Sequence, residues 1–447
     1  MNELVKKLCD TLNFNKKIKY EHEFSGQLLP FFTRNPERMK FTNGFSPVIG
    51  VISRIINGED LELQIKEFDI SNTSLETSVD ESTVNRMFSP NMYRDMRSSK
   101  LLQYLPLSSG KARKGEIRIG EFLVDLLNLK ENTDFIDMFK SDEASNLYEK
   151  IIFESLEKNK DSRITKNHNF RYYDNRQYFS KYFNSDIKHF KNNEEYFYAH
   201  IGELLEFYYL TYVIQTTIRI SNGNISKDDE VLPVFFNLGN ESVSQSRKAI
   251  QQGYNMVYQH GQGLLMDTDI LNYLNVLIPD DSYFYWKNEI LSDDFIYREQ
   301  LLSNLKEFVI AFSEQLNGEL LSGIDLHFDN LDEGIKSLRL LLETRNDKSP
   351  DSRFAKSLSD IVQQNYSRNH GRLGKALSLS NETILMLTSA IVGREKMLLN
   401  TVFQEFEHRG VFFDRITKNK VINLYEQANI LEKLSDSGDA QYVRGIL

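Results

Sequence analysis

Three positive charges in one short stretch, Arg368, Arg372 and Lys375, could contact a nucleic-acid backbone. Lys and Arg bind nucleic acid by neutralising backbone phosphates and releasing counterions. Two glycines in the same stretch favour chain flexibility. The stretch therefore predicts a flexible basic arm that could follow a DNA backbone, with a solvated loop as the alternative.

A second group of candidates is expected on one face of a helix. Arg, Asn and Gln are the side chains that form paired hydrogen bonds with base edges in the major groove. At helical spacing, a buried stripe of Val421, Leu424, Tyr425 and Ala428 leaves the opposite face to solvent. The outward residues that we expect to contact DNA are Arg415, Asn419, Lys420 and Asn423. A solvated surface or a protein-binding face is the alternative.

Three helices, a short strand and a hairpin are expected to position the second group. Apolar residues between 384 and 428 recur at helical spacing in three segments. Gly393 and Gly410 are expected to end the first two helices, and Asp414 to cap the third. Two extended arms around a turn of Ser, Asp and Gly residues then follow. This order predicts a winged-helix domain over residues 379–447.

The turn between the two extended arms is acidic. It contains Asp436 and Asp439, which phosphates would repel. We therefore expect DNA contacts from the basic arm and the third helix, and protein contacts from the hairpin.

Composition restricts the function classes further. The formal charge is -10, with a sequence pI near 5.5, so the molecule as a whole is not expected to coat a polyanion. A local basic face would still suffice for DNA binding. The single cysteine, Cys9, excludes an intrachain disulfide and a Cys-based zinc cage, and it fits a reducing compartment. No signal peptide is recognisable, so we expect a cytoplasmic protein.

The predicted fold is mainly α: a multi-helical body with a small mixed N-terminal region and a C-terminal winged helix. Turn residues divide the chain into four expected parts. They are a mixed N-terminal region (1–130), a helical middle domain (131–345), a linker with the basic arm (346–378), and the winged-helix domain (379–447). Residues 45–70 could form a hairpin, or residues 41–52 could be a loop leading into a helix. The nearly apolar run 201–220 is expected to be a buried helix rather than a membrane span.

Three other segments are weaker candidates for chemistry. The basic run 108–115 lacks the Gly and Ser or Thr positions of a phosphate-binding loop, so a solvated loop is expected. Asp325, His327 and Asp329 could ligate a metal on a strand, but a polar loop with Asp329 as a helix cap is the simpler interpretation. Arginines and rings over 170–179 could stack on bases or pack internally. No catalytic, cofactor or metal motif is recognisable, so we expect a non-enzymatic protein without cofactors.

The C-terminal residues resemble a known family. The similarity lies in Arg372–Gly374, in the run Arg409–Arg415, and in Leu431–Val443. These segments resemble the G subunit of DNA phosphorothioation-dependent restriction systems (DptG or DndG).

The resemblance implies a non-catalytic subunit of a bacterial anti-phage defence complex. Its implied partners are an ATPase-like F subunit, a helicase-like H subunit and double-stranded DNA, with no membrane. Such a complex restricts DNA that lacks a sulfur in place of a non-bridging phosphate oxygen. The alternative is a protein adaptor whose winged helix docks the ATPase partner without contacting DNA.

Overall fold

The computed structural model describes residues 2–14, 29, 44–59, 61, 102–139, 176–191, 193–221, 231–239, 242, 244, 247–284, 287–316, 324–344, 362, 365–433 and 441–447. Within these residues the fold is mainly α, as the sequence predicted, and the strands are short.

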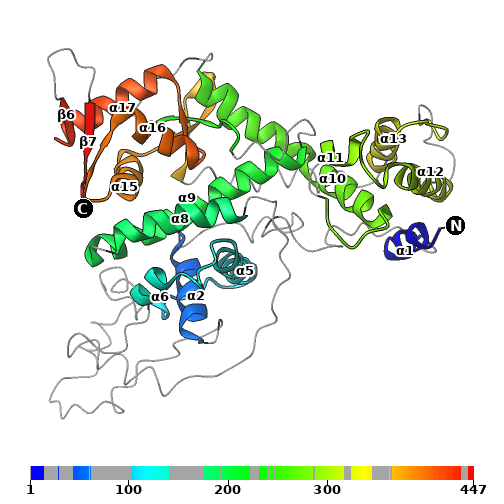
Figure 1. Ribbon diagram of the computed structural model, residues 1–447, viewed down its shortest axis with the longest axis horizontal. Coiled ribbons are helices and arrows are strands. Elements are labelled where there is room, and N and C mark those ends of the chain that lie inside the picture. The colour runs from blue at the N-terminus through cyan, green and yellow to red at the C-terminus, as the bar shows by residue number, and fades with distance from the viewer. Residues whose placement is uncertain are drawn as a thin grey trace, which may run out of the picture.

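The elements are labelled in Figure 1. The α-helices are α1 (Glu3–Thr11), α2 (Ser46–Asn57), α5 (Lys111–Leu126), α6 (Thr133–Phe139), α8 (Arg176–Phe190), α9 (Glu194–Ser221), α10 (Met256–Leu277), α11 (Lys287–Leu291), α12 (Arg298–Gln315), α13 (Leu331–Glu343), α15 (Asn381–Val392), α16 (Leu399–His408) and α17 (Arg415–Gln427). A π-helix, η4 (Ile250–Asn255), leads into α10, and a 3-10 turn, η5 (Gly371–Leu373), separates two strands. The strands are β1 (Phe235–Leu238), β2 (Ser367–Asn369), β3 (Lys375–Leu379), β4 (Lys396–Leu398), β5 (Phe412–Phe413), β6 (Leu431–Lys433) and β7 (Gln441–Arg444).

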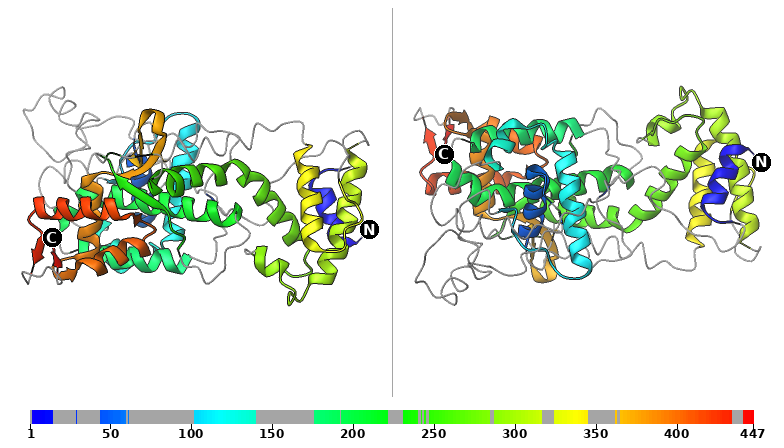
Figure 2. Two further views of the ribbon diagram at one scale, coloured as in Figure 1. Left: turned by 90° about the horizontal axis from the view of Figure 1, so that it is seen from above. Right: turned by 90° about the horizontal axis from the view of Figure 1, so that it is seen from below.

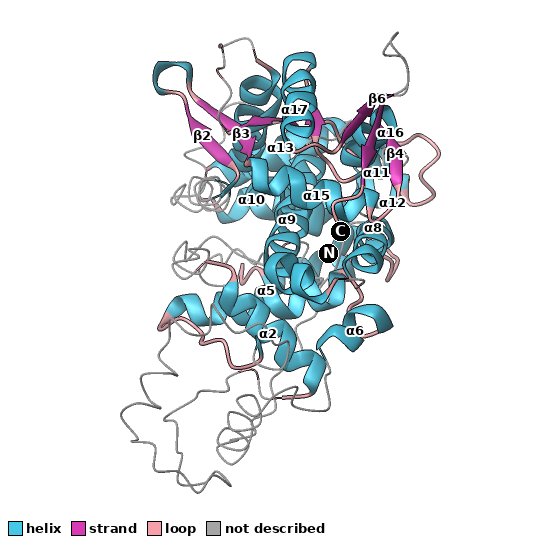
Figure 3. Ribbon diagram, turned by 90° about the vertical axis from the view of Figure 1, so that its left-hand side faces the viewer, coloured by secondary structure: helices cyan, strands magenta, loops and turns pink. Residues whose placement is uncertain are grey.

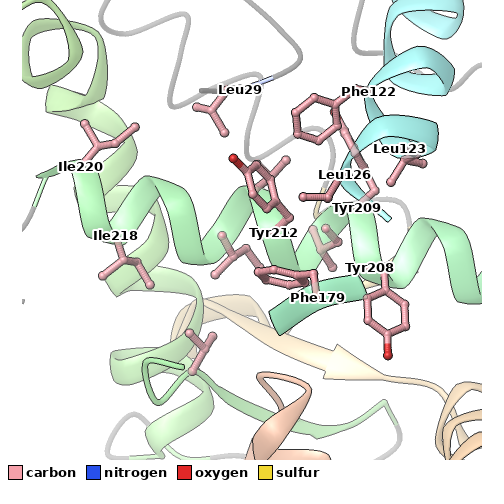
Figure 4. Close-up of a cluster of buried hydrophobic side chains, with 14 of the residues drawn as sticks. Leu29, Phe122, Leu123, Leu126, Phe179, Tyr208, Tyr209, Tyr212, Ile218 and Ile220 are labelled. Atoms are coloured by element: carbon pink, nitrogen blue, oxygen red, sulfur yellow. The ribbon is translucent and has the colours of Figure 1, made fainter. Parts of the chain in front are cut away.

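Helix α9 lies at the centre of the molecule, with the C-terminal helices on one side and α2, α5 and α6 on the other (Figure 1). A helix that is apolar on every face has to be buried, and residues 204–220 of α9 are buried without exception. The ring of Tyr212 lies 5.2 Å from that of Phe122 in α5 and 5.5 Å from that of Phe179 in α8 (Figure 4). The predicted buried helix is confirmed, and no described helix is long and apolar enough to cross a membrane.

Helices α1, α12 and α13 form a cluster at the opposite end of the molecule from the C-terminal unit (Figure 2). Helix α1 packs against α10 and α12. The ring of Phe14, just after α1, lies 5.9 Å from that of Phe308 and 5.3 Å from that of Phe312, both on α12. The N-terminal residues thus pack onto the chain's middle segment rather than onto α2.

Helix α2 shows that the hairpin prediction for residues 45–70 was wrong and that the helical alternative was right. Pro47 fits the first turn of a helix, where its missing N–H needs no partner, and Gly58 ends the helix with a φ of 71°. A short apolar run does not distinguish a strand from a buried helix, which explains the error. Among the described residues up to 139, the N-terminal region contains helices and no strand.

The basic run 108–115 is also helical in part, because α5 begins at Lys111. The backbone amide of Ser108 donates to Oε2 of Glu116 at 2.8 Å and closes the turn before the helix. Arg113 and Arg118 are half-buried. The predicted solvated loop is therefore limited to the residues that precede α5.

Two small sheets lie on the C-terminal side of the molecule (Figure 3). The first has the order β2-β3-β1-β5, in which β1 is parallel to both β3 and β5 while β2 is antiparallel to β3. The second is antiparallel and has the order β4-β7-β6. Because β1 lies between β3 and β5, the first sheet joins residues from three of the four expected domains.

Some predicted features lie outside the described residues. They are the linker over 346–361, the second arm of the predicted hairpin over 62–70, the aromatic and arginine-rich run as far as residue 175, and the acidic turn over 435–439.

Candidate nucleic-acid interface

Helix α17 carries four of the predicted DNA-contacting residues, and its predicted buried stripe is confirmed at Val421 and Tyr425, whereas Leu424 is half-buried and Ala428, at the end of the helix, is exposed. The carboxylate of Asp414 caps the helix by accepting the Thr417 amide at 2.9 Å. Val421 and Tyr425 are fully buried, and the Tyr425 hydroxyl forms a 2.7 Å hydrogen bond with that of Thr388 in α15. This stripe fixes which face of α17 points outward.

The opposite face of α17 is open to solvent. The four predicted residues are all exposed: Arg415, Asn419, Lys420 and Asn423. Within the described part of the chain, their side chains form no ion pair or hydrogen bond. Their donors and acceptors are therefore available to a ligand, and Ile416, which is 52% exposed, lies among them.

The N-terminus of α17 is held by a buried arginine from the segment before η4. Arg247 binds both carboxylate oxygens of Asp414, through Nε at 2.8 Å and Nη2 at 3.0 Å, and Nη2 also donates to Oγ1 of Thr417 at 2.9 Å. Burial raises the pKa of Asp414, but the hydrogen bonds from Arg247 and from the Thr417 amide outweigh it and keep that pKa below its ordinary value. The cap therefore stays ionised and fixes the first turn of α17.

Arg368, Arg372 and Lys375 do not form the predicted flexible arm, which is a correction to that prediction. They belong to the β2–β3 hairpin, in which Arg368 pairs with Ala376 and Asn369 with Lys375. Two glycines make the turn possible, because Gly371 has a φ of 61° and Gly374 a φ of 98°. The glycines that suggested flexibility instead close a tight turn.

The hairpin presents its charges beside a pair of tyrosines. Arg368 and Arg372 are exposed, and Lys375 is half-buried with its Nζ 5.3 Å from the ring centroid of Tyr254. The rings of Tyr254 and Tyr258 are stacked, with centroids 6.2 Å apart and planes at 8°. Cations and aromatic faces together suit contact with phosphates and bases. The local sequence did not predict this pairing, because Tyr254 lies on η4 and Lys375 follows much later in the chain.

The two predicted groups lie in different places on the same side of the molecule. Strand β2 is at one edge of the first sheet, while α17 follows β5 at the other edge. Both the hairpin and α17 lie on the side away from α2 and α5 (Figure 3). They therefore form two separate contact regions rather than one cluster.

The segment that could have held a metal is a loop before α13. The amide of His327 donates to Oδ1 of Asp325 at 2.8 Å, and Asp329 lies 3.7 Å from Lys306. Asn330, not the predicted Asp329, caps α13 by accepting the Glu333 amide at 2.9 Å. No group of three potential metal ligands occurs within the described ranges.

A scan against protein-family models and a search of curated proteins found no match to this chain. Functional inference therefore depends on the side chains of α17 and the hairpin, together with the resemblance of the C-terminal residues.

Proposed function

We propose that this protein is a non-catalytic subunit of a DNA phosphorothioation-dependent restriction complex and contacts duplex DNA through α17 and the β2–β3 hairpin. One observation carries most of the weight: Arg415, Asn419 and Asn423 are exposed on one face of a helix whose N-terminus is fixed by Arg247. Arg and Asn are suited to base edges, and a rigid helix positions them.

The arrangement around α17 supports a winged-helix domain. Helix α15, strand β4, helices α16 and α17, and strands β6 and β7 follow one another, and β7 lies between β4 and β6. In helix-turn-helix proteins the recognition helix lies in the major groove, and α17 is the corresponding helix here. The short strand β5 departs from this plan, because it pairs with β1 in the other sheet.

The F and H subunits enter this proposal through the family resemblance, and the cytoplasmic location through the single cysteine, which fits a reducing compartment. The net charge of -10 agrees with a subunit that contributes local contacts while other subunits supply most of the attraction for DNA.

Duplex binding measured against salt tests the proposal. The binding variant replaces four residues with Ala: Arg368, Arg372, Lys375 and Arg415. A matched control replaces four exposed lysines elsewhere: Lys6, Lys7, Lys130 and Lys336. The slope of log K against log salt should become shallower by about 0.9 for each phosphate that the binding variant no longer neutralises. An unchanged slope, or an equal change in the control, would contradict direct DNA contact.

A protein adaptor is the second candidate, and the exposure of Ile416 favours it. A large apolar side chain that is 52% exposed in the middle of a polar helix face suits the centre of a protein interface. Ile416→Ser should then abolish co-purification with the F subunit, while duplex binding, measured separately, stays as in the wild type. Retained co-purification would count against the adaptor.

A further inference from the structure

A cavity of about 530 Å³ lies between α9 and four other segments of the chain. Its walls come from α9, the start of α2, the segment 102–105 before α5, the segment 365–368 that enters β2, and the start of α15. Gly202 of α9 lets the helices meet here, because a Cβ at this position would lie 2.5 Å from Cδ1 of Ile49 in α2. The cavity is separate from the outward face of α17.

Two carboxylates of α9, those of Glu203 and Glu206, line the cavity one helical turn apart. Nδ2 of Asn365 donates to both oxygens of Glu206, at 2.9 and 3.2 Å, and the Thr383 hydroxyl donates to Oε1 of Glu203 at 2.5 Å. Each carboxylate oxygen can accept more than one hydrogen bond, so both groups keep acceptor capacity. The cavity therefore offers a pair of anchored acceptors to a ligand that donates.

An arginine of β2 supplies the opposite charge. Arg368 lines the cavity and is exposed, and the residues described here include no ion-pair partner for it. A guanidinium presents a fork of donors that matches a phosphate. Phe45 and Tyr198 add aromatic surface to the lining. A suitable ligand combines a donating edge, a flat apolar body and an anionic group.

We infer that the cavity binds a guanine nucleotide, with its base on Glu203 and Glu206 and its phosphate on Arg368. Guanine fits because its N1–H and N2–H groups donate side by side from a neutral base. Adenine and cytosine each have a ring-nitrogen acceptor beside their amino donor. Thymine has a single N–H donor between two carbonyl acceptors. The phosphate of the nucleotide would pair with Arg368, which lines the same cavity as the two carboxylates. The nucleotide could be free or part of an unstacked DNA strand, because the chemistry of both is the same.

Calorimetric titration of the full chain with dGMP, dAMP, dCMP and dTMP tests the inference, at about pH 8, because burial raises the pKa of Glu206 to about 7 and its carboxylate accepts on both oxygens only above that pH. We expect dGMP to bind at least about 10-fold more tightly than the other three, because losing hydrogen bonds to a charged acceptor costs that much or more. Titration with a short single strand containing one guanine, beside dGMP, identifies which source binds better. Binding of spermidine in place of dGMP would overturn the inference, as would equal binding of all four mononucleotides.

Two variants locate the site. Glu206→Gln should weaken dGMP binding at least about 10-fold, because an amide places a donor against the donors of guanine. Arg368→Ala should reduce the affinity for dGMP to the affinity for deoxyguanosine, which has no phosphate. Arg372→Ala is the control and should leave dGMP binding unchanged, because Arg372 is an exposed arginine of the same hairpin that does not line the cavity. Arg368 is exposed, so its variant tests the site without changing the buried part of α9. Unchanged dGMP binding in Arg368→Ala would overturn the assignment, whatever the outcome for duplex binding by α17.

Discussion

Helices α9 and α17 both carry charged and amide side chains, but those within residues 204–220 of α9 are buried, while α17 presents its own on a face open to solvent. On α9, Gln215 is 1% exposed and binds both the amide and the carbonyl of Leu232 at 2.9 Å. On α17, Asn419 and Asn423 are exposed and have no such partner in the described residues. The same side-chain type thus holds the fold together on one helix and is available for binding on the other.

This contrast separates stability from function. A buried polar group is costly unless it is fully hydrogen-bonded, so its partners are part of the fold. An exposed polar group contributes little to stability, so changes to it affect mainly what the protein binds. Substitutions at buried polar residues of α9 or their partners should therefore lower stability, whereas substitutions on the outward face of α17 should change binding and leave stability almost unchanged.

The largest effect on stability is expected at the buried ion pair beside α9. Arg409 is 2% exposed at its side chain, and its Nη2 lies 2.5 Å from Oδ1 of Asp186, which is fully buried. The Tyr208 hydroxyl of α9 donates to the other oxygen of Asp186 at 2.6 Å. Arg409→Met should lower the free energy of unfolding by about 3–5 kcal/mol, because it leaves a buried carboxylate without a counter-ion. Urea denaturation measures the change.

Two controls make this prediction specific. Arg415→Met, on the outward face of α17, should change the free energy of unfolding by less than about 0.5 kcal/mol. The double variant Arg409→Met/Asp186→Leu should recover much of the loss, because it removes both charges together. If Arg409→Met costs no more than Arg415→Met, the contrast between buried and exposed charges is wrong.

The contrast also explains what the sequence could predict. The Asp414 cap and the buried residues of α17 lie within a few residues of one another, so local pattern was enough to predict the helix and its outward face. The partners of the buried charges lie far away: Arg409 and Asp186 are 223 residues apart, and Arg247 and Asp414 are 167 residues apart. Such pairs depend on the tertiary fold, which periodicity does not reveal.

The hairpin of β2 and β3 was missed for a related reason. Glycines and basic residues fit a flexible arm and a tight turn equally well. The deciding interaction is the pairing of β3 with β1, which joins Ser378 to Asn237 from a distant part of the chain. Locally, only Ala376, Leu377 and Leu379 suggested burial, and so short an apolar run does not by itself distinguish a strand from another buried segment.

A smaller effect, which depends on pH, is expected at Glu206 of α9. Burial raises its pKa from 4.5 to about 7. Between pH 4.5 and pH 7 the carboxyl of Glu206 is protonated in the folded protein and ionised in the unfolded chain. The stability that Glu206 contributes is therefore complete below pH 4.5 and is lost as the pH rises to 7. Glu206→Gln should therefore raise the free energy of unfolding by about 1–3 kcal/mol at about pH 8 and change it little at about pH 5. Thermal unfolding at both pH values measures the difference.

The exposed Glu343→Gln on α13 is the matched control and should give no pH-dependent gain. Burial also raises the pKa of Glu121 to about 7, so Glu206→Gln should flatten the pH profile only in part. A gain of the same size at both pH values would show that Glu206 is ionised in the folded protein at both.

The smallest effect on stability is expected on the outward face of α17, where the effect on binding should be clearest. Asn419→Ala/Asn423→Ala should change the free energy of unfolding by less than about 0.5 kcal/mol, because neither side chain has a partner to lose among the described residues. Each paired contact with a base is worth about 1–3 kcal/mol of discrimination, so preference among duplex sequences should weaken at least about 5-fold. The salt slope should stay the same, because amides neutralise no phosphate. Gln300→Ala/Gln315→Ala removes two exposed amides from α12 and should change neither property. A loss of sequence preference with an unchanged salt slope would assign base contacts to α17, whereas no loss of preference would leave its polar face to a protein partner.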